Sequence, residues 1–259
     1  MIGQIGRRVP VFAILAVASA ASAATTVNSD FQTGPGASAT FTPTYTVDGP
    51  NLLAGLTPTT SVGDFTTETT AGTGVLTNGS FGTLPIYTGA ASTKTNVAAT
   101  GPGAGSSITY TLAGPSTITE IEVLGGWADN GRDAQNYSVS IATGGTSTFV
   151  PLNLAGATVA TGTATVTGNS VAYNPAAPGG VQVAARTTIT DTGGAPLATN
   201  VTAIRFDFGA VENNYTGTAE LAVVGTPEPA SLAVFGVGGF AVLARRRRAE
   251  LALLRQKKS

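Results

Sequence analysis

Short stretches in which apolar and polar residues alternate fill the middle of the chain. The clearest lie at 108–112, 121–123 and 204–208, where every second residue is apolar. A period of two is typical of strands that bury one face, and weaker alternation appears at 40–47, 137–141, 181–189 and 219–223. No long amphipathic helix and no fixed-period repeat competes with this pattern. Residues 24–226 are therefore predicted to form an all-β domain, a jelly-roll-like two-sheet β-sandwich of about ten short strands.

The N-terminal end departs from alternation. Two arginines, Arg7 and Arg8, precede an apolar run at 11–18, and small residues follow at 21–23. This order is the pattern of a secretory signal peptide. We predict a signal peptide at 1–23, removed by signal peptidase at a cleavage site formed by Ala21, Ala23 and Ala24.

The C-terminal end carries a second uninterrupted stretch. Fifteen uncharged residues, 230–244, lie between a Pro-Glu-Pro tripeptide and an arginine cluster, namely Pro227, Glu228, Pro229, Arg245, Arg246, Arg247 and Arg248. Fifteen residues rise only about 22 Å as a helix, and about 18 apolar residues are usual for a membrane span, so a buried core helix is the alternative. Flanking arginines extend the reach by snorkelling, which favours a short transmembrane helix. Basic residues at both ends predict that everything between them is exported and that 249–259 form a basic cytoplasmic tail.

This order of C-terminal elements, from Pro227 to Arg248, resembles the PEP-CTERM sorting signal, which is also labelled the C-terminal domain of ice-binding proteins. Thr226 stands where that family often has Val, and the tail continues past the arginines where many members stop. The resemblance implies recognition by an exosortase, a membrane transpeptidase-like protease. It also implies delivery to the cell surface or the extracellular polysaccharide, with membrane anchoring before processing.

Composition narrows the chemistry of the exported part. Residues 24–226 hold four basic and twelve acidic residues, a net charge of −8, which argues against nucleic acid as a partner. The chain has no cysteine and no histidine, so disulfides, Ser-His-Asp or Cys-His catalysis and histidine zinc sites are excluded. Carboxylate chemistry, a metal bound by oxygen ligands, or binding without reaction remain.

The stretch 118–141 reads as strand, loop, strand, and its loop is unusually polar. It holds the only tryptophan of the chain beside a cluster of polar side chains: Trp127, Asp129, Asn130, Arg132 and Asp133. Together with 201–225, this stretch resembles a galactose-binding-like, discoidin-type β-sandwich. The resemblance implies a jelly roll whose loops at one end bind sugars, lipids or calcium.

Two interpretations of this loop stay open. As a ligand site, Trp127 would stack on a sugar ring, and the oxygens of Asp129, Asn130 and Asp133 would bind hydroxyls or calcium. As a structural element, Asp-Asn-Gly would form a tight turn, Arg132 would pair with a carboxylate, and Trp127 would close the end of the core.

A carboxylate pair offers the remaining catalytic hypothesis. Glu120 and Glu122 share one strand face with Cα atoms about 7 Å apart, a spacing that glycosidases use. Two solvated glutamates on an outward face are the simpler explanation. We therefore expect a non-catalytic, structural or carbohydrate-associated protein without a resident cofactor. The alternatives are a calcium-dependent glycan-binding module and a carboxylate-dependent polysaccharide hydrolase.

Overall fold

The computed structural model describes residues 24–36, 39–86, 96–100, 106–129 and 131–229. Several predicted features lie outside these residues: the signal peptide with Ala21 and Ala23, the apolar segment 230–244, Arg245 to Arg248, the tail, and Asn130. Among the described residues, no helix has the length and apolar character needed to cross a membrane.

The regular structure of the described chain is almost entirely strand, with nearly no helix, which confirms the all-β prediction. Two short 3-10 helices, η2 (Gly72–Thr77) and η4 (Glu212–Asn214), interrupt them. The strands are β1 (Thr25–Thr33), β2 (Thr60–Val62), β3 (Ala98–Thr100), β4 (Ser106–Trp127), β5 (Gln135–Thr143), β6 (Val150–Pro151), β7 (Thr158–Thr161), β8 (Thr165–Thr167), β9 (Ser170–Tyr173), β10 (Val183–Asp191), β11 (Ala198–Phe208) and β12 (Thr216–Pro227).

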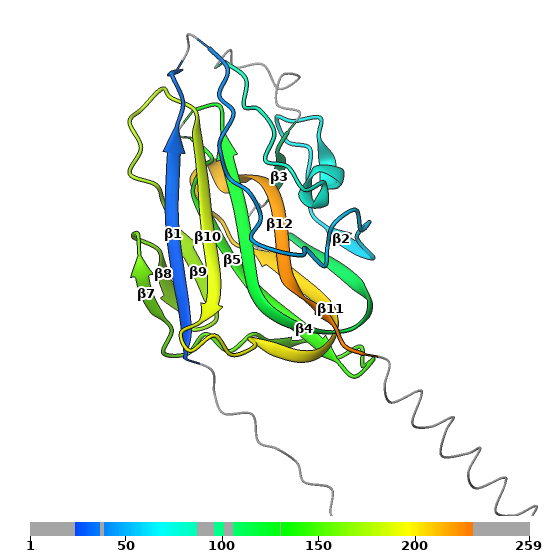
Figure 1. Cartoon of the computed structure of the whole chain (residues 1–259). Coiled ribbons are helices and arrows are strands. Elements are labelled where there is room, and N and C mark those ends of the chain that lie inside the picture. Colours follow the sequence, from blue (N-terminus) through cyan, green and yellow to red (C-terminus); the bar gives the residue numbers. More distant parts are fainter. Residues whose placement is uncertain (1–23, 37–38, 87–95, 101–105, 130, 230–259) are drawn as a thin grey trace, which may run out of the picture.

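Strand β4 joins two layers into one nearly barrel-shaped sheet (Figure 1). Its first half pairs with β2 and β11, and its second half pairs with β10 and β12. One layer therefore runs β7-β1-β10-β4-β12-β3, and the other runs β2-β4-β11-β5-β9-β8 with β6 on β5. The alternating stretches 108–112 and 121–123, predicted as separate strands, are the two halves of this single 22-residue strand.

Pro115 lies where β4 passes from one layer to the other. Proline has no N–H to give to a ladder and is tolerated in strands at edges and bulges. The partner strand β11 shifts register at the same place, between Ala198 and Ala203. The corner of the sheet thus coincides with the residue least able to continue regular pairing.

The main core lies between the two layers and is formed by the predicted apolar faces. Ile108, Tyr110, Ile121, Ile204 and Phe206 are each 0% exposed. A smaller apolar cluster lies on the other face of the first layer, where Phe81, Leu84 and neighbouring residues pack on Leu124, Trp127 and Ala184. The outer face of this layer is therefore partly covered.

The covering segment includes 40–47, which alternation predicted to be a strand. The structure shows that this prediction is wrong, because among the described residues the segment makes a single bridge, between Phe41 and Leu84. Pro43 lacks an N–H, and the N–H of Thr44 donates to the side chain of Gln32 at 2.9 Å instead of to a strand. The segment is held by side chains and not by a ladder.

A buried polar network ties the layers together inside the core. The Gln135 amide donates to the carbonyls of Val123 and Ala185 at 3.2 and 3.1 Å and accepts from the Thr187 hydroxyl at 2.7 Å. The Tyr137 hydroxyl lies 2.8 Å from that of Thr187. Each polar group thus has a partner, as burial requires.

The two ends of the described chain lie at the same end of the molecule. Glu120 of β4 pairs with Thr190 on one side and with Val224 on the other. Thr190 in turn pairs with Thr26, so the start of β1 and the end of β12 lie at the same level along the sheet. Trp127 pairs with Val183 at the opposite end. Figure 1 shows the start of β1 and the end of β12 at the lower end of the sheet.

Candidate functional site

The Trp127 loop connects β4 to β5. The Trp127 side chain is 3% exposed and packs into the smaller apolar cluster. The Arg132 guanidinium covers its ring at 5.1 Å from the centroid and lies 5.6 Å from that of Tyr215. Both terminal nitrogens of Arg132 also bond the carboxylate of Glu68, one of them at 3.0 Å. A buried ring under a guanidinium offers no open face to a sugar, which agrees with the structural interpretation of these two residues.

The acidic residues of this loop have different surroundings. Asp129 Oδ1 accepts the N–H of Gly131 at 3.0 Å, as expected for the tight turn. Asp133 is 1% exposed, and within the described residues neither of its oxygens has a hydrogen-bond partner. Burial, followed by the neighbouring carboxylate of Glu212, raises the pKa of Asp133 to about 8. A group in this environment favours its protonated form or an added cation.

Calcium binding in this loop stays a prediction. Asn130 lies outside the described residues, and those described contain no group of three or more acidic, His or Cys side chains suited to a metal ion. Of the three predicted ligands, Asp129, Asn130 and Asp133, the last is favoured by its buried carboxyl beside Glu212.

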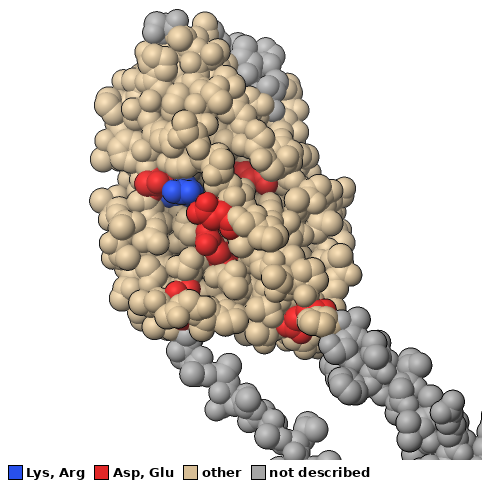
Figure 2. Space-filling model, viewed as in Figure 1, with Lys and Arg blue, Asp and Glu red and all other residues tan. Residues whose placement is uncertain are grey.

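A second site lies on the outer face of the first layer, where β1, β10 and β4 run side by side. It is a cavity of about 360 Å³, here named the Arg186 pocket, lined by Asn28, Ser29, Asp30, Asp48, Glu120, Thr161, Arg186, Thr188 and Thr190. Figure 2 shows basic and acidic side chains meeting on this face, while the other charged side chains in view are acidic and lie apart from one another. Sequence reasoning missed this site because its lining comes from segments far apart in the chain.

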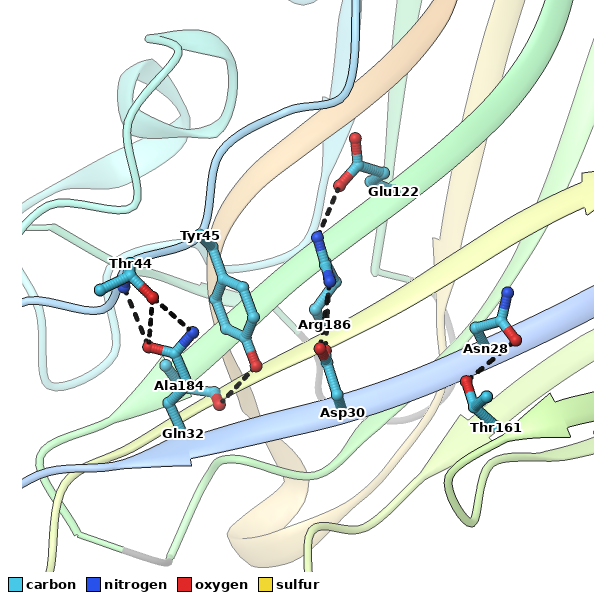
Figure 3. A network of polar contacts seen from close by, with 9 residues as sticks. All are labelled: Asn28, Asp30, Gln32, Thr44, Tyr45, Glu122, Thr161, Ala184 and Arg186. Atoms are coloured by element: carbon cyan, nitrogen blue, oxygen red, sulfur yellow. Dashed lines mark hydrogen bonds and ion pairs between the residues drawn. The ribbon is translucent and has the colours of Figure 1, made fainter.

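Arg186 is held in place within the pocket. Its Nε and one terminal nitrogen donate to the two oxygens of Asp30 at 3.3 and 3.0 Å (Figure 3). Its other terminal nitrogen lies 3.9 Å from Glu122, and the Tyr45 ring lies 4.9 Å from the guanidinium carbon. Two other residues of the pocket are also bonded to each other: the Thr161 hydroxyl donates to the Asn28 amide oxygen at 3.0 Å. The pocket wall is therefore preorganised by contacts among its own residues.

Glu120 and Glu122 were both predicted to face solvent, and for Glu122 this prediction is wrong. Glu122 is 0% exposed, and its Oε1 accepts the N–H of Asp48 at 2.9 Å. Glu120 is half-buried; burial, and after it the charge of Glu122, raises its pKa to about 7. The reason is the covering segment, whose backbone crosses this face of the sheet.

Glu220 of β12, the strand beside β4, is also a buried carboxylate that bonds a covering segment. It is 1% exposed, accepts from the Asn51 amide at 3.2 Å and from the N–H of Gly79 at 3.1 Å. Buried carboxylates on the outer face thus fasten the covering segments to the sheet. Burial raises the pKa of Glu220 to about 8.

The Pro-Glu-Pro tripeptide lies at the end of β12. Pro227 is the last residue of the strand and pairs with Ser116 of β4. Glu228 is half-buried and contacts β4 and β11 through its backbone and its carboxylate. Pro227 and Glu228 of the predicted processing signal are thus held against the domain.

Comparison with known proteins identifies the C-terminal segment. Residues 226–248 match the PEP-CTERM protein-sorting motif, so the chain carries this motif, as its sequence predicted. The motif implies export, a membrane-anchored sorting signal and processing by an exosortase-type enzyme. No curated protein and no solved structure matches the chain. The resemblance of the middle region to a discoidin-type sandwich therefore stays a prediction.

Proposed function

We propose that the exported domain is a non-catalytic, carbohydrate-associated component of the cell surface or the extracellular polysaccharide, and that its Arg186 pocket holds a saccharide. The sorting motif supports delivery beyond the cytoplasmic membrane. The pocket supports the choice of ligand.

One observation carries the proposal: all nine side chains that line the pocket are polar. An apolar ligand would leave the polar groups of such a wall without partners, whereas a sugar presents hydroxyls that both donate and accept. The carboxylates accept, the guanidinium donates, and the amide and hydroxyl groups do both. The volume of about 360 Å³ falls within the range of small-molecule pockets.

Charge selects among saccharides. Asp30, Asp48 and Glu120 outnumber Arg186 in the pocket, and residues 24–226 carry a net charge of −8. A polyanionic polysaccharide would be repelled by this field. The favoured ligand is a neutral or amino-bearing saccharide.

The absence of catalysis is part of the proposal. The carboxylate of Glu122 faces the backbone of the covering segment and is sealed from solvent, so it cannot reach a glycosidic bond. Its role in fastening that segment accounts for its position. The hydrolase hypothesis paired Glu120 with Glu122, and the buried Glu122 cannot serve as the second carboxylate that glycoside hydrolysis uses.

Calorimetry with the purified exported protein tests the proposal, with dextran, chitosan and alginate as neutral, amino-bearing and acidic probes. We expect binding to dextran or chitosan that falls at least tenfold in a Thr188→Val/Thr190→Val double variant, because both hydroxyls leave the pocket wall. The matched control is Thr165→Val/Thr167→Val, two exposed threonines at the same spacing on β8. Failure of the wild-type protein to bind any of the three, with or without calcium, would refute the proposal.

A calcium-dependent glycan site in the Trp127 loop is the second candidate, favoured by the buried carboxyl of Asp133 beside Glu212. The same titrations separate the two. Binding abolished by a chelator and unaffected by Thr188→Val/Thr190→Val would assign the ligand to that loop.

A further inference from the structure

The processing signal begins inside the folded domain. Strand β12 stays paired with β4 as far as Pro227, whose partner is Ser116. The backbone N–H of Glu228 then donates to the carbonyl of Pro115 at 2.8 Å. The ladder between the two strands therefore continues into the Pro-Glu-Pro tripeptide itself.

The Glu228 side chain is bound as well. Its Oε1 accepts the backbone N–H of Asn200 at 2.6 Å and the hydroxyl of Thr117 at 3.0 Å. These three groups, the Pro115 carbonyl, the Thr117 hydroxyl and the Asn200 N–H, are here named the Glu228 cradle. Bonds from two donors to one charged acceptor are stronger than bonds between neutral groups.

The cradle has a local cause in the fold. Strand β11 shifts register between Ala198 and Val201, and Asn200 within this bulge has a φ of 56°, a conformation that asparagine tolerates better than most residues. A bulge removes an N–H from the ladder, and here Glu228 accepts it. Pro115, at the corner of β4, leaves its carbonyl to the Glu228 N–H. Two irregularities of the sheet thus meet at the one charged residue of the tripeptide.

We infer that the Glu228 cradle competes with the exosortase-type enzyme for the sorting signal, so that processing requires the end of β12 to detach from the domain. A protease binds its substrate as an extended strand, and groups of the enzyme bond the backbone and side chains of that strand. The same N–H and carboxylate of Glu228 cannot bond the cradle and an enzyme at once. This inference rests on the sorting motif and does not depend on the saccharide pocket.

Thr117→Val tests the inference because it weakens the cradle without altering the signal that the enzyme recognises. Thr119→Val is the matched control: it lies two residues along the same strand and donates to the Val224 carbonyl at 3.3 Å, outside the cradle. Substituting Glu228 itself would be uninformative, since both partners use it.

The first measurement is hydrogen exchange on the full-length precursor, purified from a host in which the processing enzyme is inactive. The amides of Glu228 and Asn200 are expected to be protected in the wild type. In Thr117→Val these amides should exchange about tenfold faster, because the variant loses one hydrogen bond to a charged acceptor. In Thr119→Val they should exchange at the wild-type rate. Exchange of the wild-type Glu228 amide as fast as in a free peptide would overturn the inference.

The second measurement is pulse-chase processing of the full chain in the native host. Thr117→Val is expected to be processed faster than the wild type, and Thr119→Val at the wild-type rate. Processing of Thr117→Val at the wild-type rate or more slowly would overturn the inference, the slower result meaning that the cradle presents the signal to the enzyme. Neither result depends on saccharide binding. Failure of the proposed function can therefore be distinguished from failure of this inference.

Discussion

Replacing Arg132 by methionine tests whether the Trp127 loop is held by this side chain. The substitution keeps an unbranched apolar stem and removes the guanidinium, which is 5.1 Å from the Trp127 ring and 5.6 Å from that of Tyr215. Each of these contacts is worth about 1 kcal/mol. The ion pair with Glu68 adds about 1 kcal/mol, since the Glu68 side chain is 50% exposed and its charge is screened.

These terms are partly offset. Arg132 is 7% exposed, and its Nε has no hydrogen-bond partner among the described residues, so removing the buried charge recovers some desolvation free energy. The net loss in free energy of unfolding is about 2 kcal/mol. In a domain of this size that lowers the Tm by about 4 to 8 °C.

The assay is urea unfolding followed by tryptophan fluorescence. Trp127 is the only tryptophan of the chain, so the signal reports on this loop alone. Glu68→Gln is the control, because it removes the ion pair and leaves both ring contacts, and about 1 kcal/mol should be lost. Equal stability of Arg132→Met and the wild type, within about 0.5 kcal/mol, would refute the reasoning.

Three further predictions concern buried polar groups. The pKa values of Asp133 and Glu220 are raised to about 8, so the folded state holds these protons more tightly than the unfolded state. The free energy of unfolding should therefore be highest near pH 4 and fall as the pH rises through 8. The fall should be shallower in Asp133→Asn. A free energy of unfolding that does not change with pH in urea titrations would contradict this prediction. If calcium binds beside Asp133, millimolar calcium should restore stability at pH 8 in the wild type but not in Asp133→Asn. Gln135→Met loses three hydrogen bonds and should cost about 3 kcal/mol, against about 1 kcal/mol for Tyr137→Phe, which loses one; equal losses in chemical denaturation would count against the network.

Local patterns in the sequence predicted the strands and the core faces well. Alternation placed Ile108, Ile121 and Phe206 inward because strand geometry fixes side-chain direction over a few residues. The C-terminal motif was also recognisable, since its elements follow one another directly in the chain. Both features depend on short-range order only.

Features made by distant residues could not be predicted in the same way. Glu68 lies 64 positions from Arg132, and Asp30 lies 156 positions from Arg186, so neither ion pair leaves a mark on the local sequence. The covered outer face was missed for the same reason, and Glu122 was expected in solvent although the backbone of Asp48 seals it. A strand-interior arginine in a chain with few charges was the only available hint of the Arg186 pocket.

The antiparallel pairing of β12 with β4 has a mechanical consequence. The end of β12 carries the first residues of the sorting signal, and it lies at the same end of the sheet as the start of β1. Its hydrogen bonds to β4 lie perpendicular to the strand, so tension applied at Pro229 along the strand axis strains them all together in shear. Peeling the strand sideways would break them one at a time at much lower force. Drag on the domain by fluid flow would therefore be resisted by the whole length of β12.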